Sequence, residues 1–300
     1  MTNLVEMDMM TRNVYSAIRY HNVDHAKSSS PPPPPLIVDG DTGYGGPSNM
    51  MRTISSLSRS GAAAISIEDQ MFPKKCTIAA GSKIQIVTRD EAIERVRGAI
   101  GARDLYYNGV VDNERSDSSN NNNHVGKGTW IVARSDCRMA YGFNEVIERC
   151  LHFEQLGAEI IYAENLQSVE EYQILRDRLD SRTVTIVAQV QESLMSVGAG
   201  GGGSRGNGKP LLTLQEIGEL GYDLALFGVT PLQCVVGALD NTAKQLLGSP
   251  ADDDHGGSMT TGLILGGGQS PTPIPMADFS DVKRVVGFDH LERFETEFPC

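Results

Sequence analysis

The segment LIVDGDTGYGG, residues 36–46, decides how the rest of the chain is interpreted. It opens with a short apolar run of the kind that forms buried strands in parallel sheets. Asp39 and Asp41 follow two positions apart, so their side chains are expected on one face of the extended chain. Two carboxylates on one face repel each other unless a cation lies between them, and oxygen ligands suit Mg²⁺ or Mn²⁺. For this pair alone, an ordinary turn rich in aspartate and glycine is the favoured alternative.

Short apolar runs of the same kind recur along the chain, with helical patterns between them. The predicted strands are 36–38, 62–67, 130–133, 159–163, 184–190 and 223–227, and residues 143–151 and 169–179 show helical spacing. Alternating strands and helices predict an α/β fold with a parallel sheet, either a barrel or a doubly wound sheet. No GxGxxG follows the first strand, which disfavours a dinucleotide-binding sheet. Polar residues follow most of the strands, as in barrel enzymes, which place their active site at that end.

The composition limits the possible classes of partner. The chain has 300 residues, 40% of them hydrophobic, which suits one large domain, and its net charge of -12 argues against nucleic acid or an anionic membrane as a partner. Its five scattered cysteines include no CxxC pair, so we expect neither a zinc site nor a disulfide framework. No apolar run approaches the roughly 20 residues of a membrane span. We therefore expect a soluble intracellular protein, with cytoplasm and mitochondrion equally open.

Four low-complexity segments interrupt the alternating pattern, at about 28–35, 107–127, 197–209 and 249–275. They are rich in proline, serine, asparagine or glycine and have little apolar surface to bury. The strand–helix alternation continues on both sides of them. We therefore expect surface loops within a single domain that covers residues 1–300.

Further polar side chains follow the predicted strands. Glu68 ends the second strand, Arg134 ends the third, and Glu164 follows the fourth. An arginine at such a position can clamp a carboxylate with two parallel hydrogen bonds. Taken singly, a solvated loop is an even alternative for Glu68, and a structural salt bridge is the commoner role for an arginine.

The segment PKKC, residues 73–76, places Lys74 and Lys75 beside Cys76. Neighbouring lysines lower the pKa of a thiol and favour the thiolate, which is a competent acid or base. On its own, however, the segment favours an ordinary basic loop with a bystander cysteine.

Taken together and in this order, the motifs DGDTGYGG, ISIEDQMFPKKC, IVARSD and YAEN resemble the isocitrate lyase / phosphoenolpyruvate mutase superfamily, in particular its 2-methylisocitrate lyase-like branch. The resemblance implies a TIM-type (β/α)₈ barrel that assembles into homodimers or tetramers. It also implies a Mg²⁺ (or Mn²⁺) site formed by Asp39, Asp41 and Glu68, and a small-molecule carboxylate as substrate.

The resemblance further implies the roles of individual residues. Cys76 would move the proton of the leaving carbon acid, Lys74 would contact the substrate, and Arg134 would clamp a carboxylate. The remaining substrate-binding residues would be Tyr44, Gly45, Lys75, Glu164 and Gln189. The implied activity is that of a carbon–carbon bond lyase acting on a small 2-hydroxy or 2-oxo dicarboxylic or tricarboxylic acid of the 2-methylisocitrate or dimethylmalate type.

The chain departs from the family pattern at several positions. Thr77 and Ile78 replace a Gly-His pair, Gln189 replaces an asparagine, and Gln233 replaces an arginine, which favours a substrate with two carboxylates over one with three. The resemblance runs from about Leu36 to Phe227, and the helix over residues 9–20 corresponds to the one that follows the family's first two strands, so we expect the family's third to eighth strands in a barrel that lacks the first two. Two alternatives therefore remain. One is an oxaloacetate hydrolase or a phosphonate-processing relative, and the other is an inactive remnant or scaffold subunit.

Overall fold

The structure, a computed structural model, describes residues 3–23, 32–75, 84–114, 128–189, 212–228, 230–247, 293 and 296–298. These residues fall into two compact units, Met1–Leu226 and Phe227–Cys300, and each is described by itself. A single domain over the whole chain stays a prediction. The predicted loops at 197–209 and 249–275 lie outside the described residues.

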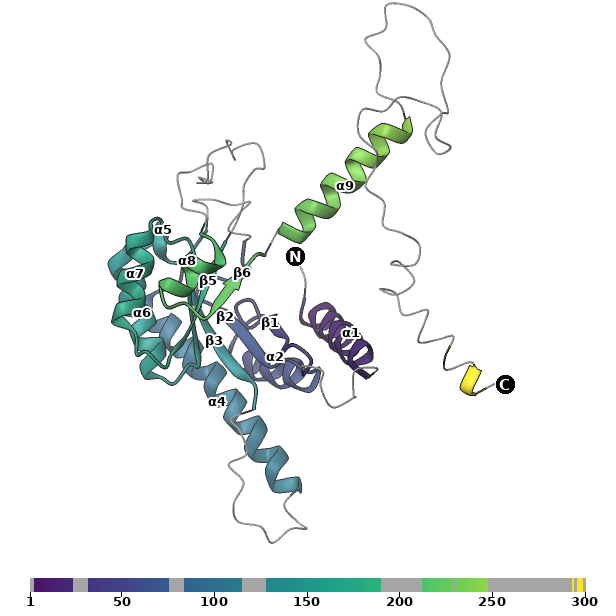
Figure 1. Ribbon diagram of the computed structural model, residues 1–300. Coiled ribbons are helices and arrows are strands. Elements are labelled where there is room, and N and C mark those ends of the chain that lie inside the picture. Colours follow the sequence, from purple (N-terminus) through teal and green to yellow (C-terminus); the bar gives the residue numbers. More distant parts are fainter. Residues whose placement is uncertain are drawn as a thin grey trace, which may run out of the picture. The chain divides into compact units, whose positions relative to one another are not determined.

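Six parallel strands form one sheet in the first unit, curled into half of a barrel (Figure 1). They are β1 (Ile37–Asp39), β2 (Ala64–Glu68), β3 (Trp130–Ser135), β4 (Ile160–Ala163), β5 (Val184–Ala188) and β6 (Leu224–Leu226). Their order in the sheet is the order in the sequence. A doubly wound sheet reverses its strand order at a switch point. That alternative is therefore wrong, and the six predicted strands are confirmed with ends that differ by one or two residues.

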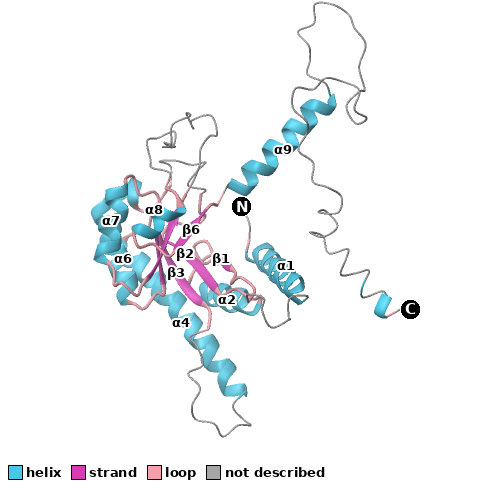
Figure 2. Ribbon diagram, in the orientation of Figure 1, coloured by secondary structure: helices cyan, strands magenta, loops and turns pink. Residues whose placement is uncertain are grey.

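The helices of the first unit are α1 (Leu4–Val23), α2 (Pro47–Arg59), α4 (Arg89–Glu114), α5 (Arg138–Tyr141), α6 (Phe143–Gln155), α7 (Val169–Arg178) and α8 (Leu214–Glu219). Figure 2 shows them around the strands, and α2, α4 and α6 contact the sheet directly. The second unit contains α9 (Thr230–Leu247). In the described part of the chain, no helix is both long and apolar enough to cross a membrane.

The two faces of the sheet bury different side chains, because successive residues of a strand point to opposite faces. Outward-facing Ile65, Ile67 and Ile131 are fully buried and pack with Ile54 and Leu57 of α2. A second outer cluster packs β3 and β4 against α4, α6 and α7. On the inner face a smaller cluster contains Ala64, Val132, Ile160, Tyr162, Ile186 and Ala188. Both faces are apolar, which explains why the strands appear as continuous apolar runs in the sequence.

Two predicted boundaries are corrected. The loop predicted at about 107–127 is wrong in its first part, because α4 continues to Glu114; residues 115–127 are not described. The hydroxyl of Tyr107 accepts a hydrogen bond from the backbone N–H of Thr129 at 2.9 Å, which holds this turn of the helix against the start of β3. The helix predicted at 9–20 is longer and spans Leu4–Val23. Of the predicted loop at 28–35, the described residues 32–35 have no regular secondary structure.

Candidate functional site

Strand register brings polar side chains together at the carboxyl end of the sheet. Glu68 of β2 lies opposite Arg134 of β3, which in turn lies opposite Tyr162 of β4. Asp39 ends β1 and pairs with Ser66, which lies two residues before Glu68. Residues in one register row of a parallel sheet, or two positions apart on one strand, point to the same face, so these four side chains share the inner face at the end where barrel enzymes hold their substrates.

The acidic side chains meet around a single ammonium group. The Nζ of Lys74 lies 2.9 Å from Oδ2 of Asp39 and 3.6 Å from Oε2 of Glu68, and it also contacts Oδ1 of Asp41. The backbone fixes this arrangement, because the N–H of Glu68 donates to the carbonyl of Asp41 at 3.0 Å and the N–H of Asp41 donates to Oδ1 of Asp39 at 2.9 Å. The three carboxylates thus lie around one ammonium group, and their role as metal ligands stays a prediction.

The loop after β1 packs tightly on α2. Asp41 and Tyr44 have positive φ angles of 51° and 58°, and that of Gly43 is 86°. A Cβ on Gly43 would lie 2.4 Å from Cε of Met50, while its carbonyl accepts a hydrogen bond from Oγ1 of Thr53 at 3.1 Å. Glycine is needed here for the backbone angle, and the contacts of this loop with α2 fix where the Asp41 carboxylate lies.

Burial dominates the electrostatics of the acidic cluster. Burial and the nearby charge of Asp136 raise the pKa of Glu68 to about 8, and burial together with the charge of Asp39 raises the pKa of Asp41. For Lys74, burial alone would lower the pKa, but the charges of Asp39 and Glu68 and the contact with Asp41 offset it, so its pKa is raised. Neither carboxylate oxygen of Glu68 makes a hydrogen bond to a described residue.

This donor set is suited to a divalent cation. All its donors are carboxylate oxygens, and the buried oxygens of Glu68 have no other hydrogen-bonding partner among the described residues. As the side chains stand, however, no group of three His, Cys, Asp or Glu residues in the described ranges is arranged to hold a metal ion. The cation among the carboxylates is the Lys74 ammonium.

Arg134 faces the inner hollow from β3. Its Nε donates to Oδ1 of Asp136 at 2.8 Å, its guanidinium lies 5.0 Å from the centre of the Tyr162 ring, and its Nη2 is 3.9 Å from Oε2 of Glu164. The hydroxyl of Tyr162 donates to Glu164. The hollow has a volume of about 330 Å³, and Arg134 is the only cation among its described lining residues: Ile37, Val38, Asp39, Ser66, Val132, Arg134, Tyr162, Ile186, Leu224, Ala225 and Leu226.

A second layer of buried polar groups supports Arg134, and the sequence analysis did not assign it a role. Asp136 accepts hydrogen bonds from Nε2 of Gln70 at 2.6 Å and from Arg134. Asp69 accepts from the N–H of Asp136 and from Oγ of Ser135, both at 2.7 Å. Asp69 also pairs with Arg149 of α6. The position of these residues at strand ends was visible in the sequence, but their mutual contacts were not.

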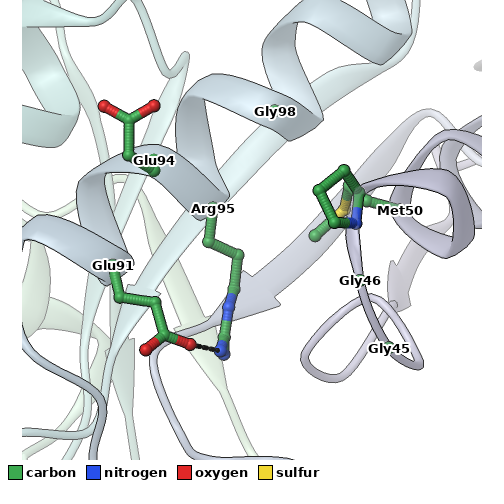
Figure 3. A pocket seen from close by; sticks show the side chains of 8 residues that line it. Gly45, Gly46, Met50, Glu91, Glu94, Arg95 and Gly98 are labelled. Carbon is green, nitrogen blue, oxygen red and sulfur yellow. Dashed lines mark hydrogen bonds and ion pairs between the residues drawn. The ribbon is translucent and has the colours of Figure 1, made fainter.

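The loop after β1, residues 40–46, is called the glycine loop. A second hollow, of about 200 Å³, is lined by this loop and by helices α2 and α4 (Figure 3). Its lining residues are Gly45, Gly46, Pro47, Met50, Glu91, Glu94, Arg95 and Gly98. Arg95 pairs with Glu91 at 3.1 Å, and its Nη1 donates to the carbonyls of Glu68 at 2.9 Å and Gln70 at 2.5 Å. Arg95 therefore fixes the backbone that carries the Glu68 carboxylate.

The remaining predicted site residues are less closely gathered. The Tyr44 hydroxyl is buried, and burial with the charges of Asp41 and Asp39 raises its pKa. Lys75 is exposed, and its N–H donates to Oε1 of Gln70 at 3.0 Å. Gln189 is buried after β5, where its Oε1 accepts from the N–H of Leu212 at 2.8 Å. This backbone hydrogen bond gives the amide of Gln189 a structural role, and its contact with the substrate stays a prediction.

Other predicted positions are not connected to the site by the structure. Cys76, Thr77 and Ile78 lie outside the described residues, so their roles stay predictions. Gln233 belongs to α9 in the second unit. The structure thus brings together Asp39, Asp41, Glu68, Lys74 and Arg134, with Glu164 beside Arg134.

The raised pKa of Glu68 predicts how stability depends on pH without a metal. A carboxyl with a pKa of 4.5 in the unfolded chain and about 8 in the folded protein makes folding less favourable as the pH rises between these values. We therefore expect Glu68→Gln to match the wild type near pH 5 and to be more stable by about 1 kcal/mol or more at pH 9.

Urea unfolding at both pH values, in the presence of a chelator, measures this difference. Glu94→Gln is the matched control, because the Glu94 side chain is 63% exposed and should give no pH-dependent gain. If Glu68→Gln is no more stable than the wild type at pH 9, the ionised Glu68 carboxylate does not lower the free energy of unfolding.

Comparison with known proteins shows which family the chain belongs to. The model of the family described as phosphoenolpyruvate phosphomutase matches residues 3–247. The chain is 28% identical over 212 residues to a 2-methylisocitrate lyase of Aeropyrum pernix, and the matched region covers 71% of this chain and 56% of that protein. It is 25% identical over 263 residues to a 2,3-dimethylmalate lyase of Eubacterium barkeri, covering 88% and 72%. The chain thus spans little more than half the length of the first of these relatives.

Solved structures show the same fold. An oxaloacetate acetylhydrolase in complex with the inhibitor 3,3-difluorooxalacetate matches with a TM-score of 0.68 and 22% identity, over 99% of this chain and 77% of that one. A phosphonopyruvate hydrolase in complex with oxalate and Mg²⁺ matches with a TM-score of 0.63 and 17% identity, over 99% and 80%. At these identities, the similarity establishes the fold alone.

Proposed function

The chain belongs to the phosphoenolpyruvate phosphomutase family, and from that premise we propose that it is a Mg²⁺-dependent lyase that breaks a carbon–carbon bond in a small 2-hydroxy dicarboxylic acid. The observation that carries the proposal is the meeting of three carboxylates, Asp39, Asp41 and Glu68, around one cation at the sheet end where Arg134 faces the hollow. The similarity to two lyases, at 25% and 28% identity, supports the same class of reaction.

The metal would be held by Asp39, Asp41 and Glu68. This set offers the oxygen ligands that Mg²⁺ prefers, and the buried Glu68 carboxylate lacks hydrogen bonds to the described residues. When bound, the ion would act as a Lewis acid that stabilises negative charge on the substrate oxygens. The protein's part is to hold the three carboxylates in place, which it does through the glycine loop and through Arg95 behind β2.

Arg134 would bind a carboxylate of the substrate. Asp136 engages Nε and Nη2 of its guanidinium, while Nη1 makes no hydrogen bond to any described residue. The pairing with Asp136 keeps the guanidinium plane fixed, so less side-chain entropy is lost when a substrate binds. With one cation in the described lining of the hollow, a substrate with a single carboxylate beyond the metal-bound group fits better than one with two.

The reaction would need two proton movements. The hydroxyl on C2 loses a proton, the C2–C3 bond breaks as C2 becomes a carbonyl carbon, and C3 takes up a proton. Glu164, held by Tyr162 next to Arg134, is the residue we assign to orienting the substrate hydroxyl. Cys76 stays the predicted donor to C3, and it lies outside the described residues. Assembly into dimers or tetramers also stays a prediction.

Product analysis tests the proposal. The protein is incubated with Mg²⁺ and 2,3-dimethylmalate, and pyruvate release is followed with a coupled dehydrogenase; a chelator should abolish it. We expect 2-methylisocitrate, which carries a third carboxylate, to react more slowly. If oxalate and acetate form from oxaloacetate and neither hydroxy acid is cleaved, the activity is that of a hydrolase and not of a lyase. The absence of product from all three acids would contradict both activities.

A further inference from the structure

The position of Lys74 among the carboxylates has a consequence for metal binding. Its ammonium contacts Asp39 and Asp41 and lies 3.6 Å from Glu68, and the Lys74 side chain is 22% exposed. A lysine ammonium is a compact point charge with three N–H donors, so it can neutralise a cluster of carboxylates much as a small metal ion does. The nitrogen thus lies in the space enclosed by the proposed metal-binding oxygens.

A divalent cation and this ammonium cannot share that space. Two cations a few ångströms apart in a partly buried site repel strongly, and each carboxylate oxygen that donates to a metal ion is lost to the lysine. The described side chains agree with this, because with Lys74 in place no three acidic residues are arranged to hold a metal. The carboxylates must therefore exchange one cation for the other.

We propose that Lys74 is an internal competitor for the Mg²⁺ position: without the metal its ammonium occupies the space among the three carboxyl groups, and it leaves them when the ion binds. The inference rests on the proposed function for the identity of the metal. It gives Lys74 a role before any substrate arrives, in addition to the predicted contact with the substrate. It also explains how the protein tolerates three neighbouring carboxylates when no metal is bound.

Calorimetric titration of MgCl₂ into the wild type, Lys74→Met and Arg182→Met tests the competition. Arg182 is the matched control, since its side chain is 89% exposed and its replacement changes the net charge equally. We expect Lys74→Met to bind Mg²⁺ about tenfold more tightly or better, and Arg182→Met to bind like the wild type. Equal or weaker binding by Lys74→Met, with a wild type that binds, overturns the competition and leaves the proposed metal site intact. No binding by any of the three overturns both.

A second measurement uses the wild type alone, so it holds even if Lys74→Met does not fold. An amine-reactive reagent is added with and without Mg²⁺, and the labelling of Lys74 and Lys75 is compared by mass spectrometry. We expect Mg²⁺ to increase the labelling of Lys74 severalfold and to leave that of Lys75 unchanged. Labelling of Lys74 that stays constant or falls with Mg²⁺ would show that the ammonium does not leave.

Discussion

Replacing Arg149 with methionine is expected to lower the free energy of unfolding by about 3–5 kcal/mol, the usual cost of removing one partner of a buried ion pair. The side chains of Arg149 and Asp69 are each 1% exposed, and their charged groups lie 3.0 Å apart. Arg149 also donates to the carbonyl of Val87 and to Glu145, both at 2.9 Å. Without the arginine, the Asp69 carboxylate stays buried, and the donors left to it among the described residues are those of Ser135 and Asp136.

Urea unfolding followed by circular dichroism measures this loss. Arg182→Met is the matched control, because the Arg182 side chain is 89% exposed and its pair with Asp180 should contribute less than about 1 kcal/mol. A loss below about 1 kcal/mol for Arg149→Met would mean that Asp69 is protonated or reached by water. Because Asp69 accepts from the N–H of Asp136, which holds Arg134, the same substitution should also weaken substrate binding.

The strands could be predicted from the sequence because the sheet buries both of its faces. Runs such as AISI (64–67) and WIVA (130–133) have no charged interruption, and this pattern occurs in parallel sheets covered by helices. The order of the strands followed from the family resemblance and from the absence of a dinucleotide-binding turn. The predicted start of the loop at about 107 was wrong because asparagine and glycine after Tyr107 suggested a loop, although a helix tolerates such residues at a cost of up to about 1 kcal/mol each.

The acidic residues of the site could be predicted because they lie at or directly after strand ends. The carboxyl ends of parallel strands meet at one edge of the sheet, so side chains at these positions come close together. Asp39 and Glu68 needed only the correct strand ends. The position of Lys74 could not be predicted, because it lies after β2 without regular secondary structure and is held by three carboxylates from two separate segments. Long-range contacts of this kind leave no local periodicity in a single sequence.

Arg149 was missed although the sequence contains a signal for it. Residues 143–155 show helical spacing, and Arg149 lies three positions after Val146 and four before Phe153, on the same buried face. A charged residue within an apolar stripe indicates a buried partner, since an unpaired charge there is costly. The sequence alone does not identify that partner, because Asp69 lies 80 positions away.

The largest effect on function is expected for Asp39→Asn, which should lower Mg²⁺-dependent turnover by about 10³-fold or more and abolish the increase in Tm on adding Mg²⁺ with oxalate. The substitution keeps the shape of the side chain and removes the charge that a hard cation needs. In the metal-free protein Asp39 is one of three carboxylates around Lys74, and two remain to hold the ammonium. The Tm without Mg²⁺ should therefore stay close to that of the wild type.

This combination separates a metal ligand from a residue that only supports the fold, because a structural role would lower the Tm with and without Mg²⁺ alike. Asp177→Asn is the matched control: Asp177 is an exposed residue of α7 that accepts a hydrogen bond from Gln173, and its loss should change neither measurement. If Asp39→Asn keeps the wild-type response to Mg²⁺ while its turnover falls, Asp39 contacts the substrate rather than the ion. In that case Asp41 and Glu68, which lie near the same ammonium, are left to hold the metal.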